Sequence, residues 1–273
     1  MSKNDVVKAV VLGQLPAALS VDVSLATPLT MSRIEGRDEV VGVLRQLADS
    51  FGIGEPEFIT ADGERDFVTF VGSSQGHEVG LFAVLTRGAA DTYSAVDLYA
   101  RPWPFVKLVR DQLAASDERF RDDIDLSAPY APDGPPGGFL AEQPAGLPEL
   151  SADVVFHSPV LTDTASGSEL VGFILNAVGE ISGAPRFRIV SGFDQGFVMV
   201  YDATVHGHTW QLAGVCGLDG SGRIDDMRIY SRPWPVTAFF RGEGYKLMRD
   251  RLGPQYWQGE DPLAVLGEAD TAQ

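Results

Sequence analysis

Serine, histidine, cysteine and aspartate side chains occur at a few places where their spacing could support chemistry. Residues 72–76 read GSSQG, which matches the G-x-S-x-G pattern that surrounds a nucleophilic serine in some hydrolases. That chemistry requires a helix directly after the serine, but the residues that follow alternate like another strand. We therefore interpret Ser74 as a residue of a β-hairpin.

His206 and His208 flank Gly207, and Cys216 follows on the same predicted strand. Two histidines do not supply the three or four ligands of a zinc site, so we predict a turn here and no metal. Cys216 and His208 would form a nucleophile and base only if they met in space, and a free cysteine is more often a small buried residue. The segment GLDGSG (217–222) lacks the glycine spacing and the helix of a dinucleotide site, so we predict no cofactor.

Asp202 lies next to Tyr201 on a central predicted strand of the second half of the chain. Inside an apolar pocket, loss of hydration would raise the pKa of Asp202 toward a value useful for a general base. Asp202, His208 and Tyr201 are therefore the candidate catalytic residues, and their roles depend on which face of the sheet each side chain occupies.

An internal repeat defines the elements that must position these side chains. YARPWP (99–104) returns as YSRPWP (230–235), which is 230 − 99 = 131 residues later, and the same offset relates Gly76 to Gly207. After the motif, the second copy carries about eight additional residues, TAFFRGEG (237–244), before its helix resumes the pattern of the first copy. We therefore predict two tandem copies of one domain.

Each copy reads as a strand, a helix, an antiparallel meander of about four strands and a closing helix, which is an α+β pattern. Predicted helices cover 37–51, 105–115, 168–181 and about 236–252, and the first strands cover 21–29 and 152–161. Six of the 17 prolines fall between residues 117 and 149, which indicates an extended connector. We predict a first domain at 1–118, a Pro/Gly-rich linker at 119–147, a second domain at 148–262 and a tail at 263–273.

The composition of the 273 residues sets bounds on compartment and partners. The formal net charge of −17 disfavours nucleic acids and anionic membranes, which repel an acidic surface. No apolar stretch approaches the roughly 20 residues of a spanning helix, and the first residues do not form a secretory signal. We expect a cytoplasmic protein without a disulfide, because Cys216 is the single cysteine.

Several of these stretches together resemble a known superfamily. They are DVVFHSPVL (153–161) followed by a glycine and an amphipathic helix, the hairpin DGSGRID (219–225), and a last strand that ends in Arg-Pro. This arrangement resembles the nuclear transport factor 2-like superfamily of cystatin-like fold, and within it the SnoaL-like branch, which includes ketosteroid isomerases and limonene-type epoxide hydrolases. The resemblance covers about 22–115 and 148–252. It implies two cone-shaped domains, each a curved antiparallel sheet packed on helices around a pocket.

The resemblance also implies where acid–base chemistry would lie, and this chain departs from it. Isomerase-like members carry a carboxylate just before the proline of the first strand, where this chain has Thr27 and Ser158. Their second carboxylate lies on the strand before the DGSGR-type turn, where this chain has Ala83 and Gly214. Only 4–18 and 139–150 are available for the long first helix of such domains, so closure of one side of each pocket is in question.

Strand alternation assigns side chains to the two faces once Ser158 is placed inward. The predicted ligand-binding residues of the second copy are Phe156, Ser158, Met199, Tyr201, Trp210, Leu212, Gly214, Cys216, Met227 and Ile229. The inward residues of the first copy are Leu25, Thr27, Phe70, Leu81, Ala83, Leu85, Val96, Leu98 and Ala100. Either set could line an apolar pocket or pack as a filled core. The second set has more polar groups and a glycine that would leave space, so we expect the pocket chiefly there, with Asp202 pointing outward.

The outward faces of the last strands carry Asp97, Tyr99 and Arg101 in the first copy and Arg228, Tyr230 and Arg232 in the second. Tyrosines on the outward face of a sheet indicate that another part of the protein covers that face. We therefore expect the two copies to pair with each other as an internal pseudo-dimer, and the whole protein to be a monomer in solution. We also expect Asp97 and Arg228 to approach each other across that interface. The Trp-Pro pairs at 103–104 and 234–235 are interpreted as structural anchors, with a lid role for Trp234 as the alternative.

Three functions follow for testing. The first is a tandem SnoaL-like protein that binds a small apolar molecule, chiefly in the second domain. The alternative is a SnoaL-like isomerase, cyclase or epoxide hydrolase acting on a polyketide- or terpenoid-like substrate, which the vacant carboxylate positions disfavour. The third is a purely structural protein with filled cones. The sequence leaves open whether the protein is an enzyme.

Overall fold

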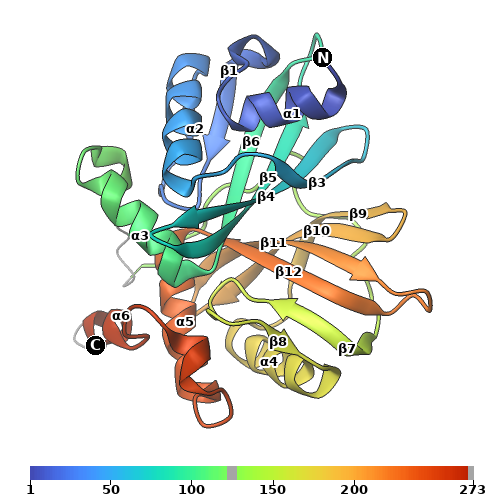
Figure 1. The fold of residues 1–273 in the computed structure, drawn as a ribbon, viewed down its shortest axis with the longest axis vertical. Coiled ribbons are helices and arrows are strands. Elements are labelled where there is room, and N and C mark those ends of the chain that lie inside the picture. Colours follow the sequence, from blue (N-terminus) through green and yellow to red (C-terminus); the bar gives the residue numbers. More distant parts are fainter. Residues whose placement is uncertain (122–127, 270–273) are drawn as a thin grey trace.

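The computed structural model describes residues 1–121 and 128–269, and it contains two units that repeat one order of elements (Figure 1). Residues 122–127 of the predicted linker and 270–273 of the predicted tail lie outside the described residues. The first unit consists of α1 (Lys3–Val11), η1 (Pro16–Ala18), β1 (Leu19–Ala26), β2 (Ile34–Glu35), α2 (Arg37–Phe51), β3 (Pro56–Ala61), β4 (Arg65–Ser74), β5 (His77–Arg87), β6 (Tyr93–Arg101), α3 (Trp103–Ala114) and η2 (Glu118–Phe120). The second unit consists of β7 (Leu150–His157), β8 (Ala165–Ser166), α4 (Ser168–Ser182), β9 (Arg186–Phe193), β10 (Gly196–Val205), β11 (His208–Leu218), β12 (Ile224–Arg232), α5 (Trp234–Met248), η3 (Pro254–Trp257) and α6 (Ala264–Ala269).

Each unit is built around an antiparallel meander, β3-β4-β5-β6 in the first and β9-β10-β11-β12 in the second. The first strand of each unit pairs in parallel with the last, β1 with β6 and β7 with β12. The meanders join at their last strands through one pairing, Ala100 with Ser231, so the strands form one continuous sheet. The predicted α+β fold with two tandem units is confirmed.

Local sequence explains where the elements begin and turn. α2 and α4 follow Gly36 and Gly167, which both have φ 89°, and the predicted helices at 37–51 and 168–181 match these elements closely. The β4–β5 and β10–β11 hairpins turn at Gln75-Gly76 and His206-Gly207, where both residues have positive φ, as a two-residue type I′ turn requires. The predictions of turns at these places are confirmed, and a strand, not a helix, follows residue 74.

Buried apolar side chains form three clusters. Two of them lie mainly between the helices and the meander of one unit each, and the third lies on the other face of the two meanders, where the units pack together. The third cluster contains Phe67, Phe82, Val84, Tyr99, Ile189, Val198, Val200, Ala213 and Tyr230. Because Tyr99 and Tyr230 are fully buried there, the outward faces cover each other as the predicted internal pseudo-dimer.

The repeated RPWP motif lies where the units meet. The Trp103 and Trp234 rings stack with centroids 5.6 Å apart. The Trp103 amide donates to the Pro159 carbonyl at 2.8 Å, and the Trp234 amide donates to the Pro28 carbonyl at 3.0 Å. Since Pro28 and Pro159 are themselves related by the 131-residue offset, these reciprocal bonds follow an approximate two-fold axis. The tryptophans therefore anchor the interface between the units.

The units differ in how their cones are covered. In the first unit α1 packs against α2, and Leu44 and Leu47 of α2 are each 1% exposed. The residues 139–149 that precede β7 form no helix, and the equivalent side chains of α4, Leu175 and Val178, are partly exposed. The additional residues of the second copy lie within α5, which places Phe240 against the Trp210 ring at 4.0 Å between centroids.

Among the described helices, none combines the length and the apolar character that spanning a bilayer requires.

Candidate functional site

The concave side of the second sheet encloses a small cavity of about 30 Å³ beneath α4 and α5. Its walls are Phe156, Ser158, Pro159, Val160, Leu161, Ile174, Leu175, Val178, Tyr201, Trp210, Leu212, Ile229, Phe240 and Met248. A space of this size holds about one or two water molecules. A larger occupant therefore requires side chains to move.

The structure brings most of the predicted ligand-binding residues into one core. Phe156, Ser158, Tyr201, Trp210, Leu212 and Ile229 line the cavity, whereas Met199, Cys216 and Met227 belong to the surrounding core and Gly214 lies on the same strand face. The space beside Gly214 is occupied, because a β-carbon there would lie 2.8 Å from Ile229 Cδ1 and 2.9 Å from Met199 Cε. The sequence patterns did not identify the wall residues that the helices contribute. The 237–244 insertion that supplies Phe240 is nevertheless visible in the sequence as an interruption of the repeat.

Two hydroxyl groups give the cavity its polar character. Ser158 Oγ accepts hydrogen bonds from the backbone amides of Val160 at 3.1 Å and Leu161 at 3.2 Å, so its own proton remains available to a ligand. Burial raises the pKa of the Tyr201 hydroxyl above its usual value, and the nearby Cys216 acts in the same direction. Tyr201 is thus a neutral hydrogen-bond donor near pH 7, not a base.

The other candidate catalytic groups lie away from the cavity. Asp202 points outward, as the assigned register predicts, and accepts bonds from Arg188 Nε at 2.9 Å and Nη2 at 2.7 Å. His208 is buried with its ring edge-on to Phe239. Burial raises the pKa of the Cys216 thiol well above its usual range, so the reactive thiolate is disfavoured.

At the positions where the family resemblance implies carboxylates, this chain has side chains that hydrogen-bond to the backbone or pack in the core. Thr27 Oγ1 accepts bonds from the amides of Leu29 and Thr30 at 3.0 Å, as Ser158 does in the second unit. Ala83 is fully buried in the first core. Within the described residues, no group of three His, Cys, Asp or Glu side chains could hold a metal ion.

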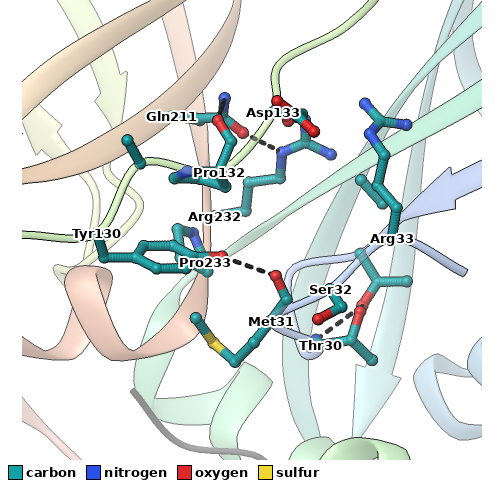
Figure 2. Close-up of a pocket in the computed structure, with 13 residues that line it drawn as sticks. Thr30, Met31, Ser32, Arg33, Tyr130, Pro132, Asp133, Gln211, Arg232 and Pro233 are labelled. Atoms are coloured by element: carbon teal, nitrogen blue, oxygen red, sulfur yellow. Dashed lines mark hydrogen bonds between the residues drawn. The ribbon is translucent and has the colours of Figure 1, made fainter. Parts of the chain in front are cut away.

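A second and larger pocket, of about 290 Å³, lies at the seam between the units (Figure 2). Its walls are Ala26, Thr27, Thr30, Met31, Ser32, Arg33, Tyr130, Ala131, Pro132, Asp133, Gln211, Arg232 and Pro233. The segment 130–133 covers it, with the Tyr130 hydroxyl donating to the Met31 carbonyl at 2.7 Å. Sequence patterns did not identify this site, because its walls come from four distant segments.

The charges at the seam differ from the predicted pairing. Asp97 accepts hydrogen bonds from Arg33 Nη2 and from Arg232 Nη2, the latter across the interface at 2.8 Å. Arg228 instead pairs with Glu57 at 2.6 Å and with Asp226 at 3.0 Å. The expected partnership of Asp97 with Arg228 is therefore wrong in its partner. β6 and β12 are antiparallel with Ala100 opposite Ser231, so Asp97 lies toward the end of β12 that carries Arg232 and away from Arg228.

Parts of the chain are similar to solved structures of cystatin-like and ketosteroid isomerase-like fold. An uncharacterised protein with a cystatin-like fold from Silicibacter pomeroyi is 20% identical, with a TM-score of 0.38, over 42% of this chain and 89% of its own. A steroid delta-isomerase from Pseudomonas aeruginosa is 14% identical, with a TM-score of 0.36, over 42% of this chain and 92% of its own. A hypothetical protein of ketosteroid isomerase-like fold from Catenulispora acidiphila, in complex with trimethylamine, is 12% identical, with a TM-score of 0.28, over 36% and 86%.

Each of these matches covers less than half of the chain, and the likeness concerns the fold alone. No family model and no curated protein matches the chain. The order and pairing of the chain's own elements define its fold, two tandem α+β units. The neighbours' names assign this chain no activity.

Proposed function

We propose that the second cone binds a small, largely apolar molecule that carries an acceptor oxygen, and that the protein acts as a binding module without acid–base chemistry of the isomerase kind. The observation that carries this proposal is the arrangement of two hydroxyl donors, Ser158 and Tyr201, in a wall that is otherwise apolar. An apolar pocket with a few placed polar groups is the usual form of a small-molecule site.

The covering of the second cone supports an entrance beside α4. Leu175 and Val178 line the cavity and are partly exposed, whereas Leu44 and Leu47 at the equivalent places of the first unit are buried. A molecule that displaces these two side chains from above would reach Tyr201 without opening the sheet. The second cone is therefore the better candidate of the two.

Binding also requires the cavity to widen from about 30 Å³, and α5 is the element that would shift. Phe240 of α5 lines the cavity, and Gly242 and Gly244 lie within the same helix. Glycine lowers the stability of a helix interior by about 1 kcal/mol relative to alanine, so this part of α5 is held by its packing more than by its own helix preference.

The enzymatic alternative finds less support in the site. Tyr201 holds its proton near neutral pH, Asp202 is paired outside the cavity, and the Cys216 thiol is buried. General-base catalysis needs a group that gains a proton near the working pH.

We also propose that the chain divides into domains at 1–118 and 148–262, joined by a linker at 119–147 and followed by a tail at 263–273.

A ligand screen with a blocked entrance tests the proposal. Thermal unfolding is measured in the presence of limonene oxide, cyclohexanone, indole or progesterone. Three proteins are compared: the unaltered chain, Val178→Trp, and the control Asn176→Trp, which changes an exposed position on the same helix. A ligand at 100 times its dissociation constant adds about 2.7 kcal/mol to the free energy of unfolding, which moves the midpoint by several degrees.

We expect at least one compound to stabilise the unaltered chain and Asn176→Trp but not Val178→Trp. Equal stabilisation of Val178→Trp, or no stabilisation by any compound up to its solubility, would refute binding in the second cone. Chromatography of the bound compound after incubation distinguishes binding from turnover, and a new product would favour the enzyme.

A further inference from the structure

The seam pocket contains a buried cationic group with an unused hydrogen-bond donor. Arg232 lines the pocket and is 3% exposed. Its Nε donates to Gln211 Oε1 at 2.7 Å and its Nη2 to Asp97 Oδ1 at 2.8 Å, while Nη1 has no hydrogen-bond partner among the described residues. A buried guanidinium donor without an acceptor is costly, so its neighbourhood favours an incoming acceptor.

The charges around this group leave one positive charge without a buried counterpart. Arg33 and Arg232 share the single carboxylate of Asp97, which is fully buried. Asp133 also lines the pocket, but it is exposed, so its charge is screened by water. Asp97, Arg232 and the part-buried Arg33 therefore sum to one positive charge, which a singly charged anion would balance.

The interface between the units has two sides that the repeat relates, one with Arg232 and one with Arg101. The polar partners of Arg232 occur only on its own side. The repeat places Arg101 at the position equivalent to Arg232, and both guanidinium groups lie over a tyrosine ring of the opposite unit, at 5.5 Å and 4.6 Å from the ring centroids. Gln211, however, corresponds to Gly80, and Arg33 corresponds to Thr164. Packing of the two sheets thus accounts for an arginine on each seam but not for the polar partners found only beside Arg232.

The walls set the size and character of an occupant. The segment 130–133 closes the pocket, held by the Thr209 amide bond to the Tyr130 carbonyl at 2.6 Å and by the Gln211 Nε2 bond to the Pro132 carbonyl at 3.3 Å. Met31, Pro132 and Pro233 supply apolar surface to the walls of the pocket (Figure 2). A volume of about 290 Å³ lies at the lower end of the range for small-molecule sites.

We propose that this seam pocket binds a small organic monocarboxylate, with the Arg232 guanidinium group as the cationic partner of the carboxylate and the apolar walls holding its hydrocarbon part. The carboxylate brings one negative charge, which matches the charge of the buried groups, and it accepts charge-assisted bonds from guanidinium readily. This site is separate from the second cone and does not depend on the function proposed for it.

Acetate, benzoate and cyclohexanecarboxylate serve as probes, with benzyl alcohol and sodium chloride as matched controls for charge and ionic strength. Thermal unfolding and the NMR signal of the Arg232 Nε–H group are followed in the complete chain. We expect at least one carboxylate to raise the unfolding midpoint and to move the Arg232 signal, and the controls to do neither.

Four variants locate the effect. Arg232→Gln should weaken the apparent affinity at least about tenfold, because it removes a charge-assisted bond, whereas Arg101→Gln, its repeat equivalent on the other seam, should bind as the unaltered chain does. Ala131→Trp places a large ring on an exposed wall residue and should abolish binding without touching the buried charges. Val178→Trp, which blocks the second cone, should leave carboxylate binding unchanged.

Three results would overturn the proposal. One is carboxylate binding retained in Arg232→Gln, or in folded Ala131→Trp if Arg232→Gln fails to fold. Another is an equal response to benzyl alcohol or chloride. The third is no response to any carboxylate at 10 mM or below, on the order of the weakest specific binding of interest, which would leave water as the occupant of the pocket.

Discussion

Replacement of Phe240 by alanine should both destabilise the protein and enlarge the cavity in the second cone. Phe240 is 1% exposed, lines the cavity and stacks on Trp210 at 4.0 Å. Removal of a buried phenylalanine side chain costs about 3–5 kcal/mol, from lost burial and from the space left behind. For a protein of this size each kcal/mol lowers the unfolding midpoint by roughly 2–4 °C, so Phe240→Ala should lower it by about 6–20 °C.

The space vacated by Phe240 joins a cavity whose other walls are mostly apolar, and such cavities stay dry and accept small apolar molecules. Indole or benzene should therefore recover part of the lost stability in Phe240→Ala and have a smaller effect on the unaltered chain. Calorimetric scans with and without the compound measure both effects. Quenching of tryptophan emission gives an independent signal, since Trp210 forms one wall of the cavity.

Phe239→Ala is the matched control. Phe239 lies beside Phe240 in the same insertion and is 8% exposed, but it contacts His206 and His208 and does not line the cavity. Its loss should destabilise the protein without any gain in ligand binding. Our account of α5 as the element that fills the second cone fails if Phe240→Ala gains no affinity, or if both variants gain it equally.

Three further predictions concern stability. Asp97→Asn should lower the free energy of unfolding by about 3–5 kcal/mol in urea titrations, because two largely buried guanidinium groups lose their shared carboxylate; Asp111→Asn, which breaks a more exposed pair on α3, should cost less than about 1 kcal/mol. Gly196→Ala should be more destabilising than Gly214→Ala in the same titrations, since its β-carbon would lie 2.0 Å from the Cys216 backbone oxygen, whereas the Gly214 neighbours are flexible side-chain ends; equal losses would contradict this. Burial raises the pKa of the Cys216 thiol, so the unfolded chain releases this proton at lower pH than the folded chain, and thermal scans should show stability decreasing as pH rises above about 9, less so in Cys216→Ala.

The periodic elements could be predicted from the sequence because each one obeys a strong local rule. Apolar residues at helical spacing after Gly36 and Gly167 located α2 and α4, and the 131-residue offset tied the two units together. Alternation anchored on Ser158 placed Tyr201 inward and Asp202 outward, as the structure does. These features depend on neighbours within one unit.

The features that could not be predicted depend on how the units cross or on residues without a repeat partner. Asp97 meets Arg232 and not Arg228 because of the antiparallel register in which β6 and β12 join, which no pattern within one unit specifies. The space beside Gly214 is taken by Met199 and Ile229, whose side-chain conformations no pattern specifies. The seam pocket joins a loop of the first unit, the connecting segment and two strands of the second, and no spacing rule relates these segments.

The connection between the units has a consequence for how the interface forms. Two separate chains would have to meet at a rate and to an extent set by their concentration, whereas a tether keeps the partner faces at an effective concentration on the order of millimolar. The pairing of Tyr99 with the opposite sheet therefore persists at any dilution. A tether also removes the requirement that both faces be identical, so a substitution such as arginine at 33 appears once, beside one seam, and each seam can acquire its own chemistry.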